Sequence, residues 1–148
     1  MQKLIISSLL LLSIALPSHA EELKVIIHGE NTSAYYQEFV SSPKNLLQDI
    51  FTLRKQRWSN GDKIKIFVLP SSNPVHKKFV QEFLELNDFR LNRIWNRMTF
   101  GGYAIPPTIV KSEAELVEKV HSTKGSIGYQ TIDRYSEIWS KTKTVAMQ

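Results

Sequence analysis

Apolar and polar residues alternate in short blocks along the first half of the chain, and their spacing predicts a strand, a helix and a second strand. Residues 23–27 are β-branched and alternating, as in a strand. Ser42 and Pro43 suit the N-cap and first position of a helix, and apolar residues follow them at helical spacing. After an Asn-Gly turn at 60–61, residues 64–68 indicate a second strand, in which aliphatic residues alternate with lysine and phenylalanine.

The second half predicts three helices and a returning strand. Asn73 and Pro74 suit the N-cap and first position of one helix, and a second apolar periodicity covers 91–98. The Ser-x-x-Glu pattern at 112–115 is a capping box before a third helix, and residues 126–130 return to the sheet. Such an order predicts the α/β class, as a small mixed β-sheet flanked by helices.

The composition fits one globular domain. The 148 residues are 42% hydrophobic and 22% charged, which is enough apolar material for a core at this length. Five aromatic residues beside aliphatic positions are predicted to lie in that core: Trp58, Phe79, Phe83, Trp95 and Phe100. We expect residues 21–148 to form a single α/β domain, in which the tail after Thr131 has the least definite pattern.

The first 20 residues have the composition of a cleaved export signal. Lys3 supplies a short positive segment, residues 4–16 are apolar, and Ser-His-Ala at 18–20 is a small-x-small cleavage site. A membrane anchor is the other interpretation, but the apolar run is shorter than a spanning helix needs and is followed by Glu21. We expect residues 1–20 to be removed on export.

The residues that carry catalysis or bind metals do not converge in any recognised pattern. The chain contains no cysteine, which excludes disulfides, thiol catalysis, cysteine-zinc sites and lipid attachment at a lipobox. His28, His76 and His121 are scattered, without the HExxH or paired spacing of a metal site. GxSxG, Walker and GxGxxG motifs are absent from the sequence. We therefore expect no metal, no cofactor and no enzymatic activity.

The net charge of +5 makes the chain basic. Arg90, Arg93 and Arg97 fall on one face of a predicted helix, opposite its apolar residues. A solvated surface is the plain interpretation, and a cationic patch that docks an acidic partner or a lipid surface is the other. Because an exported domain rarely meets nucleic acid, we expect no nucleic-acid partner and at most peripheral association with a membrane.

Several short segments together resemble one protein family. Trp-Asn-Arg-Met-Thr-Phe-Gly-Gly at 95–102 leads through Pro-Pro at 106–107 to a predicted helix and then to Gly-Ser-Ile-Gly-Tyr at 125–129. This order resembles the closing segment of phosphate-binding-protein-like solute receptors, the periplasmic proteins that feed ABC transporters. Further segments resemble the same family in the same order: 50–51, 58–61, 63–69 and 79–84. The resemblance implies a periplasmic location and one lobe of a type II periplasmic binding protein, since the chain is too short for both lobes.

The resemblance places a ligand site in the loop after the second strand. In the phosphate receptors this turn carries an Arg, an Asp and a Ser-Gly-Thr, which grip the oxyanion together with free N–H groups at the helix start. Here the Arg falls on Leu69, the Asp on Ser71 and the Ser-Gly-Thr on 73–75, so almost every side-chain ligand is replaced. What remains is a polar loop of Ser71, Ser72 and Asn73, which we expect either to hold an anion weakly or to cap the helix in solvent.

Two functions stay open at this point. The first is a solute-binding-like protein related to the substrate-binding components of phosphate ABC transporters, with a degenerate anion site. The second is an adaptor that binds no solute and contacts an envelope transporter, a porin or a sensor. The degenerate loop favours the second, whereas the resemblance supports the first directly. We predict the first, with a small anion such as phosphate and an ABC transporter or another envelope protein as partners.

Overall fold

The computed structural model describes residues 21–29, 37–38, 41–132 and 143–145. The expected export signal at 1–20 lies outside these ranges. Among the helices that the structure describes, none is both long and apolar enough to cross a membrane.

Five strands form one mixed sheet in the order β3-β2-β4-β1-β5. In chain order they are β1 (Glu22–Ile27), β2 (Lys65–Val68), β3 (Thr108–Ile109), β4 (Ser126–Ile132) and β5 (Lys143–Val145). β2 is parallel to β3 and to β4, whereas β1 is antiparallel to β4 and to β5. The expected small mixed sheet is confirmed, and β5 adds to it a strand from the tail, which the sequence pattern leaves undecided.

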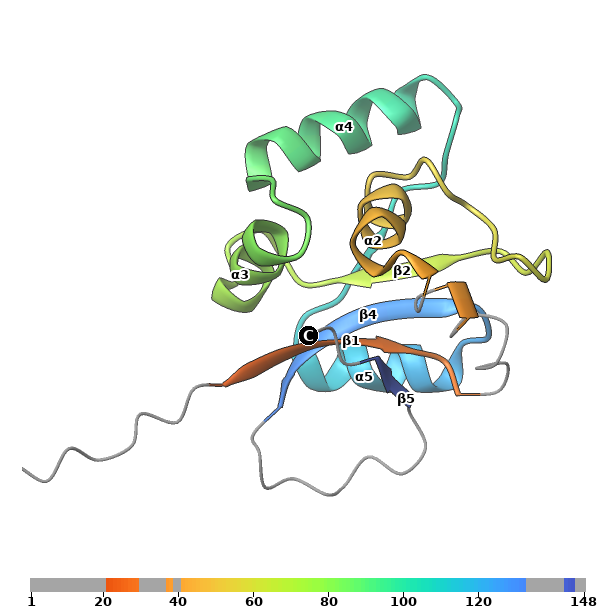
Figure 1. The fold of residues 1–148 in the computed structure, drawn as a ribbon. Helices are drawn as coiled ribbons and strands as arrows, with labels where there is room; N and C mark the ends of the chain where they lie inside the picture. Colours follow the sequence, from red (N-terminus) through yellow and green to blue (C-terminus); the bar gives the residue numbers. More distant parts are fainter. Residues whose placement is uncertain (1–20, 30–36, 39–40, 133–142, 146–148) are drawn as a thin grey trace, which may run out of the picture.

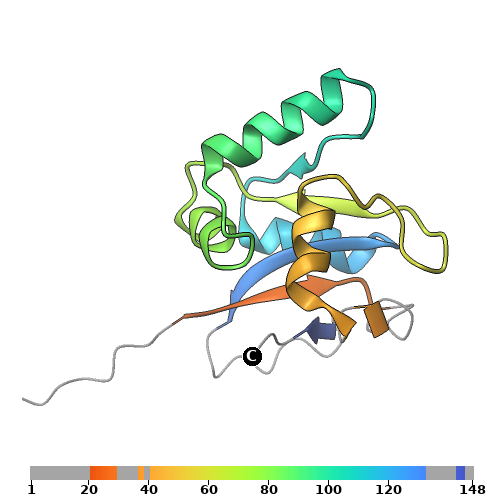
Figure 2. The same cartoon turned by 45° about the horizontal axis from the view of Figure 1, so that its top comes forward.

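Helices cover both faces of this sheet (Figure 1). α2 (Pro43–Phe51), α3 (Pro74–Glu82) and α4 (Asp88–Phe100) lie on one side, and α5 (Glu113–Ser122) lies on the other. The turned view in Figure 2 shows α4 outermost, beyond α2 and α3. The α/β class with flanking helices is therefore confirmed.

More residues of β2 are buried than its alternating sequence pattern predicts. Ile66, Phe67 and Val68 are all buried, although the sequence pattern groups Phe67 with the lysines. The reason is that β2 lies between β3 and β4 with helices on both faces of the sheet, so side chains of either direction are covered. Only Lys65, at the amino-terminal end of the strand, remains exposed.

Side-chain caps begin three of the helices, two of them at the predicted residues Asn73 and Ser112. Each capping oxygen accepts a hydrogen bond of 2.8–3.2 Å from a backbone N–H two or three residues further on: Asn73 before α3, Asn87 before α4 and Ser112 before α5. Ser42 precedes α2 as predicted, but its side chain makes no cap hydrogen bond. Pro43 instead begins that helix, at a position where a backbone N–H is not needed.

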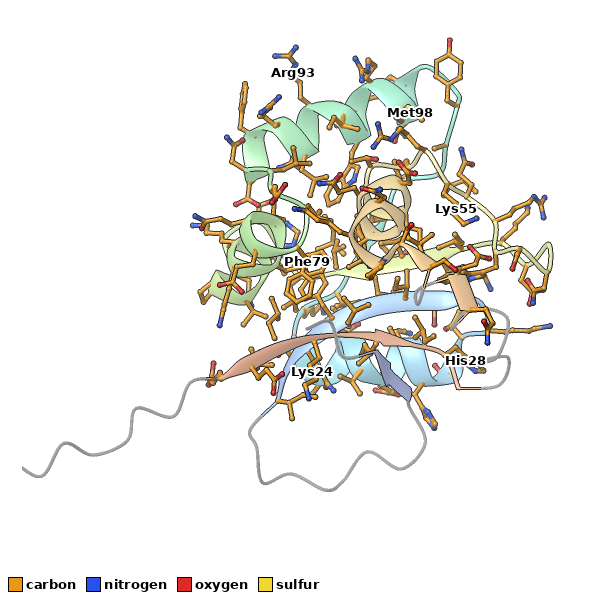
Figure 3. The ribbon with its side chains drawn as sticks, viewed as in Figure 1. Lys24, His28, Lys55, Phe79, Arg93 and Met98 are labelled. Atoms are coloured by element: carbon orange, nitrogen blue, oxygen red, sulfur yellow. The ribbon has the colours of Figure 1, made fainter. Side chains whose placement is uncertain are left out.

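Aromatic side chains join α2 and α3 to the sheet. The Phe79 ring stacks on the Tyr129 ring of β4 with centroids 4.1 Å apart, and it meets Phe51 edge to face at 4.7 Å. Figure 3 shows Phe79 pointing from α3 toward the sheet. The indole N–H groups of Trp58 and Trp95 each donate to a buried backbone carbonyl, so these tryptophans also belong to the core as predicted.

Phe100 is a wrong prediction, because it lies outside the core. Its side chain is 87% exposed at the end of α4. Leu91 and Trp95 are buried and Met98 is packed against the core, so these residues mark the inward stripe of the helix. Phe100 follows Met98 by two positions, which turns it about 200° away from that stripe. Being next to apolar residues in the sequence therefore did not place it on their face.

Candidate functional site

The Ser71, Ser72 and Asn73 loop connects the carboxyl end of β2 to the N-terminus of α3. In open α/β sheets, ligands bind outside the carboxyl ends of the strands, and a helix N-terminus presents unpaired N–H groups to an anion. The loop thus lies at a position where an anion site is chemically reasonable. What it is able to bind depends on which of its polar groups are already engaged.

Two of the three side chains are engaged within the protein. The Asn73 Oδ1 accepts from the Val75 N–H at 2.8 Å, which is the cap of α3. The Ser71 hydroxyl accepts from the Asn92 side chain of α4 at 3.2 Å, so it ties the loop to the outer helix. Ser72 is exposed. The structure therefore brings the three predicted residues together in one turn, with Ser72 the most accessible of them.

The backbone donors at the start of α3 are mostly engaged as well. Pro74 has no N–H, the Val75 N–H binds Asn73, and the Lys77 N–H donates to the Asn73 carbonyl at 3.1 Å. Of the four residues that begin the helix, at most His76 has a backbone N–H left for a ligand. The N–H groups that would normally attract an anion to a helix start are here mostly absent or bonded within the chain.

A buried polar cluster lies beneath this loop, and sequence analysis missed it. The Leu69 N–H donates to the Tyr129 hydroxyl at 2.9 Å, and the same hydroxyl lies 2.5 Å from His76 Nδ1. On the other side of the imidazole, His76 Nε2 lies 3.4 Å from Asp88 Oδ1. The cluster therefore connects the end of β2, the strand β4 and the first residues of α3 and α4.

The donor and acceptor roles of the hydrogen bonds determine where the protons of this cluster lie. Because the Tyr129 oxygen accepts from Leu69, its own proton is available for His76 Nδ1, and a neutral imidazole then carries its proton on Nε2, facing Asp88. His76 is 1% exposed, and this burial lowers its pKa, while the Asp88 charge acts in the opposite direction. Burial also raises the pKa of the Tyr129 hydroxyl above its ordinary value. The cluster is thus neutral at His76 and Tyr129 near neutral pH.

The cluster is structural in position rather than catalytic. Both His76 and Tyr129 are buried, so a substrate in solvent does not reach them. One sequence signal was available: His76, Phe79, Val80 and Phe83 follow the i, i+3, i+4, i+7 spacing of an apolar stripe. A histidine on such a stripe predicts a buried imidazole, and a buried imidazole requires polar partners.

Two of the cavities on the described part of the molecule border α4 or β2, away from this loop. One, of about 270 Å³, lies between α2, the 84–86 turn and α4, with Arg54, Arg97 and Glu85 in its lining. The other, of about 580 Å³, lies at the amino-terminal end of β2, between the 53–57 segment and residues 105–108. Neither is lined by Ser71, Ser72 or Asn73. Within the described ranges, no group of three or more His, Asp or Glu side chains is arranged to hold a metal ion.

Comparisons with known proteins identify the fold. No model of a known protein family matches the chain, and no curated protein sequence matches it. Among solved structures, the chain is similar to the ABC-type phosphate transport receptor from Vibrio cholerae, with a TM-score of 0.53 and 11% identity. It is also similar to PstS from Borrelia burgdorferi, with a TM-score of 0.50 and 22% identity. The chain has a phosphate-binding-protein-like fold.

The match covers most of this chain but less than half of each receptor. It includes 84% of this chain and 45% of the Vibrio cholerae receptor, and 76% of this chain and 41% of the Borrelia burgdorferi protein. The expected kinship in fold is confirmed. Neither similar structure is described as an enzyme. At these identities the likeness establishes the phosphate-receptor-like fold, while ligand and partner are matters for the proposal below.

Proposed function

We propose that this protein is a periplasmic, solute-binding-like protein related to the substrate-binding components of phosphate ABC transporters, with a degenerate anion site at Ser71, Ser72 and Asn73. In this proposal residues 1–20 are a cleaved signal peptide and residues 21–148 form one domain. One observation carries it: in a phosphate-receptor-like fold this loop lies between a parallel strand and a helix N-terminus, yet the backbone donors of that helix start are mostly engaged within the chain.

The engaged donors argue for weak anion binding. A phosphate that leaves water needs several charge-assisted hydrogen bonds to offset its desolvation. The loop has no arginine, the Leu69 N–H is taken by Tyr129, and the Val75 and Lys77 N–H groups are taken by Asn73. The side-chain donors that remain are all uncharged: the hydroxyls of Ser71 and Ser72 and the amide NH2 of Asn73. The first turn of α3 adds at most one N–H. We therefore expect phosphate to bind with a dissociation constant in the millimolar range.

The proposed partners follow from the same fold. A small anion such as phosphate is the proposed solute, and an ABC transporter or another envelope protein is the proposed protein partner. Because the chain spans less than half of either receptor, the binding of a solute between two lobes is not part of the proposal. The loop alone supplies the contact that we propose.

Thermal unfolding of residues 21–148 in rising phosphate and sulfate tests the proposal. For a dissociation constant of about 10 mM, phosphate at about 100 mM stabilises the native state by about 1.4 kcal/mol, which raises Tm by roughly 3–6 °C. Both anions also stabilise proteins without binding, so a variant must separate the two effects. Ser72→Glu should remove the site-specific part of the shift by repelling the anion.

A matched control adds the same charge elsewhere. Ala114 is exposed on α5, on the opposite face of the sheet, so Ala114→Glu should keep the full shift. A shift that is equal in wild type, Ser72→Glu and Ala114→Glu would show that the anions act only through the solvent, and the proposed site would then be wrong. In that case, specific capture of an envelope protein would point to the adaptor function.

A further inference from the structure

The larger cavity combines two features that the loop at Ser71, Ser72 and Asn73 lacks. Its volume of about 580 Å³ falls within the range of about 300–1,000 Å³ that is usual for pockets of small organic ligands. Its lining comes from the segment after α2, from residues 63–67 that lead into and form most of β2, and from residues 105–108 at the start of β3. It therefore lies at the opposite end of β2 from the receptor-type loop.

The inner wall of this cavity is apolar. Leu53, Ile66 and Phe67 line it and are themselves buried, so they form a fixed surface rather than mobile side chains. Ile64, which is half-buried, and Ile105, whose side chain is largely exposed, add aliphatic surface to the lining. A small inorganic anion would gain nothing from such a wall, whereas a hydrocarbon body would lose contact with water on it.

The rim of the cavity is cationic. Lys55, Arg57, Lys63 and Lys65 line it, and its lining includes no acidic residue. Figure 3 shows Lys55 at the connection between α2 and β2. Lys55 has an ion pair with Glu38 at 2.9 Å, and Arg57 donates to the Gly61 carbonyl at 2.8 Å.

The two remaining cations of the rim have no such engagement. Lys63 and Lys65 are exposed, and within the described ranges no carboxylate pairs with either side chain. Like charges that gather around a concave, partly apolar surface focus their field into it and raise the local concentration of anions. This end of β2 thus has both an electrostatic attraction for an anion and a surface for its apolar body.

We propose that this cavity binds an amphiphilic anion, a carboxylate or phosphate head group on an aliphatic body of several carbon atoms. The head group lies against Lys63 and Lys65, and the body lies on Leu53, Ile66 and Phe67. The site is separate from the loop at Ser71, Ser72 and Asn73, so it does not depend on the function proposed above. Neither a simple oxyanion nor a neutral amphiphile satisfies both halves of the cavity.

Displacement of the fluorescent anion 1-anilinonaphthalene-8-sulfonate by decanoate tests this proposal. Decanoate has both parts of the ligand, acetate has only the charge, and octyl glucoside below its micelle concentration has only the apolar body. We expect decanoate to displace the dye at a concentration about tenfold lower than octyl glucoside, and acetate to displace none. Equal displacement by decanoate and octyl glucoside would overturn the proposal, because the cations would then have no part in binding.

Paired charge reversals locate the site. Lys63→Glu with Lys65→Glu should weaken decanoate binding about tenfold or more, while Arg90→Glu with Arg93→Glu should change it less than about twofold. Both pairs are exposed and change the net charge equally, and Figure 3 shows Arg93 pointing outward from α4. Far-ultraviolet circular dichroism confirms that each variant is folded. An equal loss in both variants would show that only the net charge matters, and the site would be refuted.

Two further measurements separate the cavity from a charged surface. Ile105→Asn should weaken decanoate more than hexanoate, because only the longer chain reaches that wall; equal effects would contradict the proposed pose. Sedimentation with phosphatidylglycerol vesicles distinguishes free amphiphiles from membrane lipid. Binding to vesicles without any binding of monomeric decanoate would overturn the proposal, since the basic rim would then act only at a membrane surface.

Discussion

The two ends of β2 differ in how their polar groups are satisfied. At the carboxyl end, Asn73 caps α3, and the Leu69 N–H binds the Tyr129 hydroxyl. At the amino-terminal end, Lys63 and Lys65 lie on the rim of a cavity and have no carboxylate partner in the described part of the chain. The likeness to phosphate receptors predicts a ligand at the carboxyl end of β2. The charged side chains without an acidic partner, however, lie at the amino-terminal end.

The difference between paired polar groups at one end of β2 and unpaired cations at the other predicts different effects on stability and on anion binding. Polar groups that bind one another in the interior stabilise the fold, and removing one of them leaves its partner without a hydrogen bond. Exposed cations without partners contribute little to stability and remain free to bind an anion. Substitutions of the polar side chains at the two ends should therefore affect different measurements: the free energy of unfolding at the carboxyl end, and anion binding at the amino-terminal end.

The largest loss of stability is expected for a substitution of Gly125, whose backbone contacts the amino-terminal end of β2. Its carbonyl accepts from the Lys65 N–H and from the Trp58 indole, and its φ is +79°. A Cβ there would clash with the Lys63 carbonyl. Gly125→Ala should lower the free energy of unfolding by about 2–4 kcal/mol, measured by urea denaturation.

Gly61 is the matched control for this change. Its φ is +89°, but no atom lies within 4 Å of the Cβ position. Gly61→Ala should therefore lose only the backbone preference, about 1 kcal/mol. Equal losses at the two glycines would show that the contact with Lys63 has no influence, and that the end of β2 is free to adjust.

The next effect is expected for Tyr129→Phe at the carboxyl end. The change keeps the ring that stacks on Phe79 but removes the hydroxyl from the Leu69 N–H and from His76 Nδ1. Two buried groups then lack a partner, so the free energy of unfolding should fall by about 1–3 kcal/mol. Tyr103→Phe, at an exposed tyrosine, should stay within about 0.5 kcal/mol. An unchanged free energy of unfolding in Tyr129→Phe would indicate that water replaces the hydroxyl.

A smaller effect is expected from pH through His76. Burial lowers the pKa of His76 in the folded protein below its ordinary value of 6.5, so the unfolded state binds a proton first as the pH falls. Stability from this group is therefore complete above pH 6.5 and declines as the pH falls below it. The measurement is the difference in Tm between wild type and His76→Gln at a series of pH values. A difference that stays constant from pH 8 to pH 5 would contradict the burial of a neutral imidazole.

The smallest effect on stability is expected for Lys63→Gln with Lys65→Gln. Both side chains are exposed and unpaired with acids among the described residues, so the free energy of unfolding should change by less than about 0.5 kcal/mol. Any increase in the free energy of unfolding should appear at low salt, where the repulsion between the cations of the cavity rim is least screened. A loss of more than about 1 kcal/mol would mean that these lysines stabilise the fold, and the division between the two ends would fail.

Much of the fold was predictable because its signals are local. Asn73 and Ser112 begin helices as the sequence predicts, since a capping side chain needs only the backbone two or three residues away. The apolar spacing likewise predicts which faces of α3 and α4 are buried. Phe100 was placed wrongly, because its position on α4 turns it away from the buried stripe although apolar residues adjoin it in the sequence.

The candidate sites were predictable only in part. The strand pattern at 64–68 and the helix start at Asn73 and Pro74 are sufficient to place Ser71, Ser72 and Asn73 between a strand and a helix, and their anion-binding role stays a prediction. The pairing of His76 with Tyr129 joins residues 53 positions apart, so no local pattern contains it. The cavity at the other end of β2 combines three separate segments, and only their packing makes it concave.

The sequence by itself determined the α/β class, the starts of α2, α3 and α5, and the loss of the receptor-type side chains from the loop, because propensity, capping and residue identity are properties of neighbouring positions. Only the tertiary structure decided that the Tyr129 hydroxyl binds the Leu69 N–H beneath that loop, and that Lys63 and Lys65 border an apolar cavity. The physical reason is that hydrogen bonds across a sheet, and the shape of a cavity, depend on which distant segments come to lie side by side.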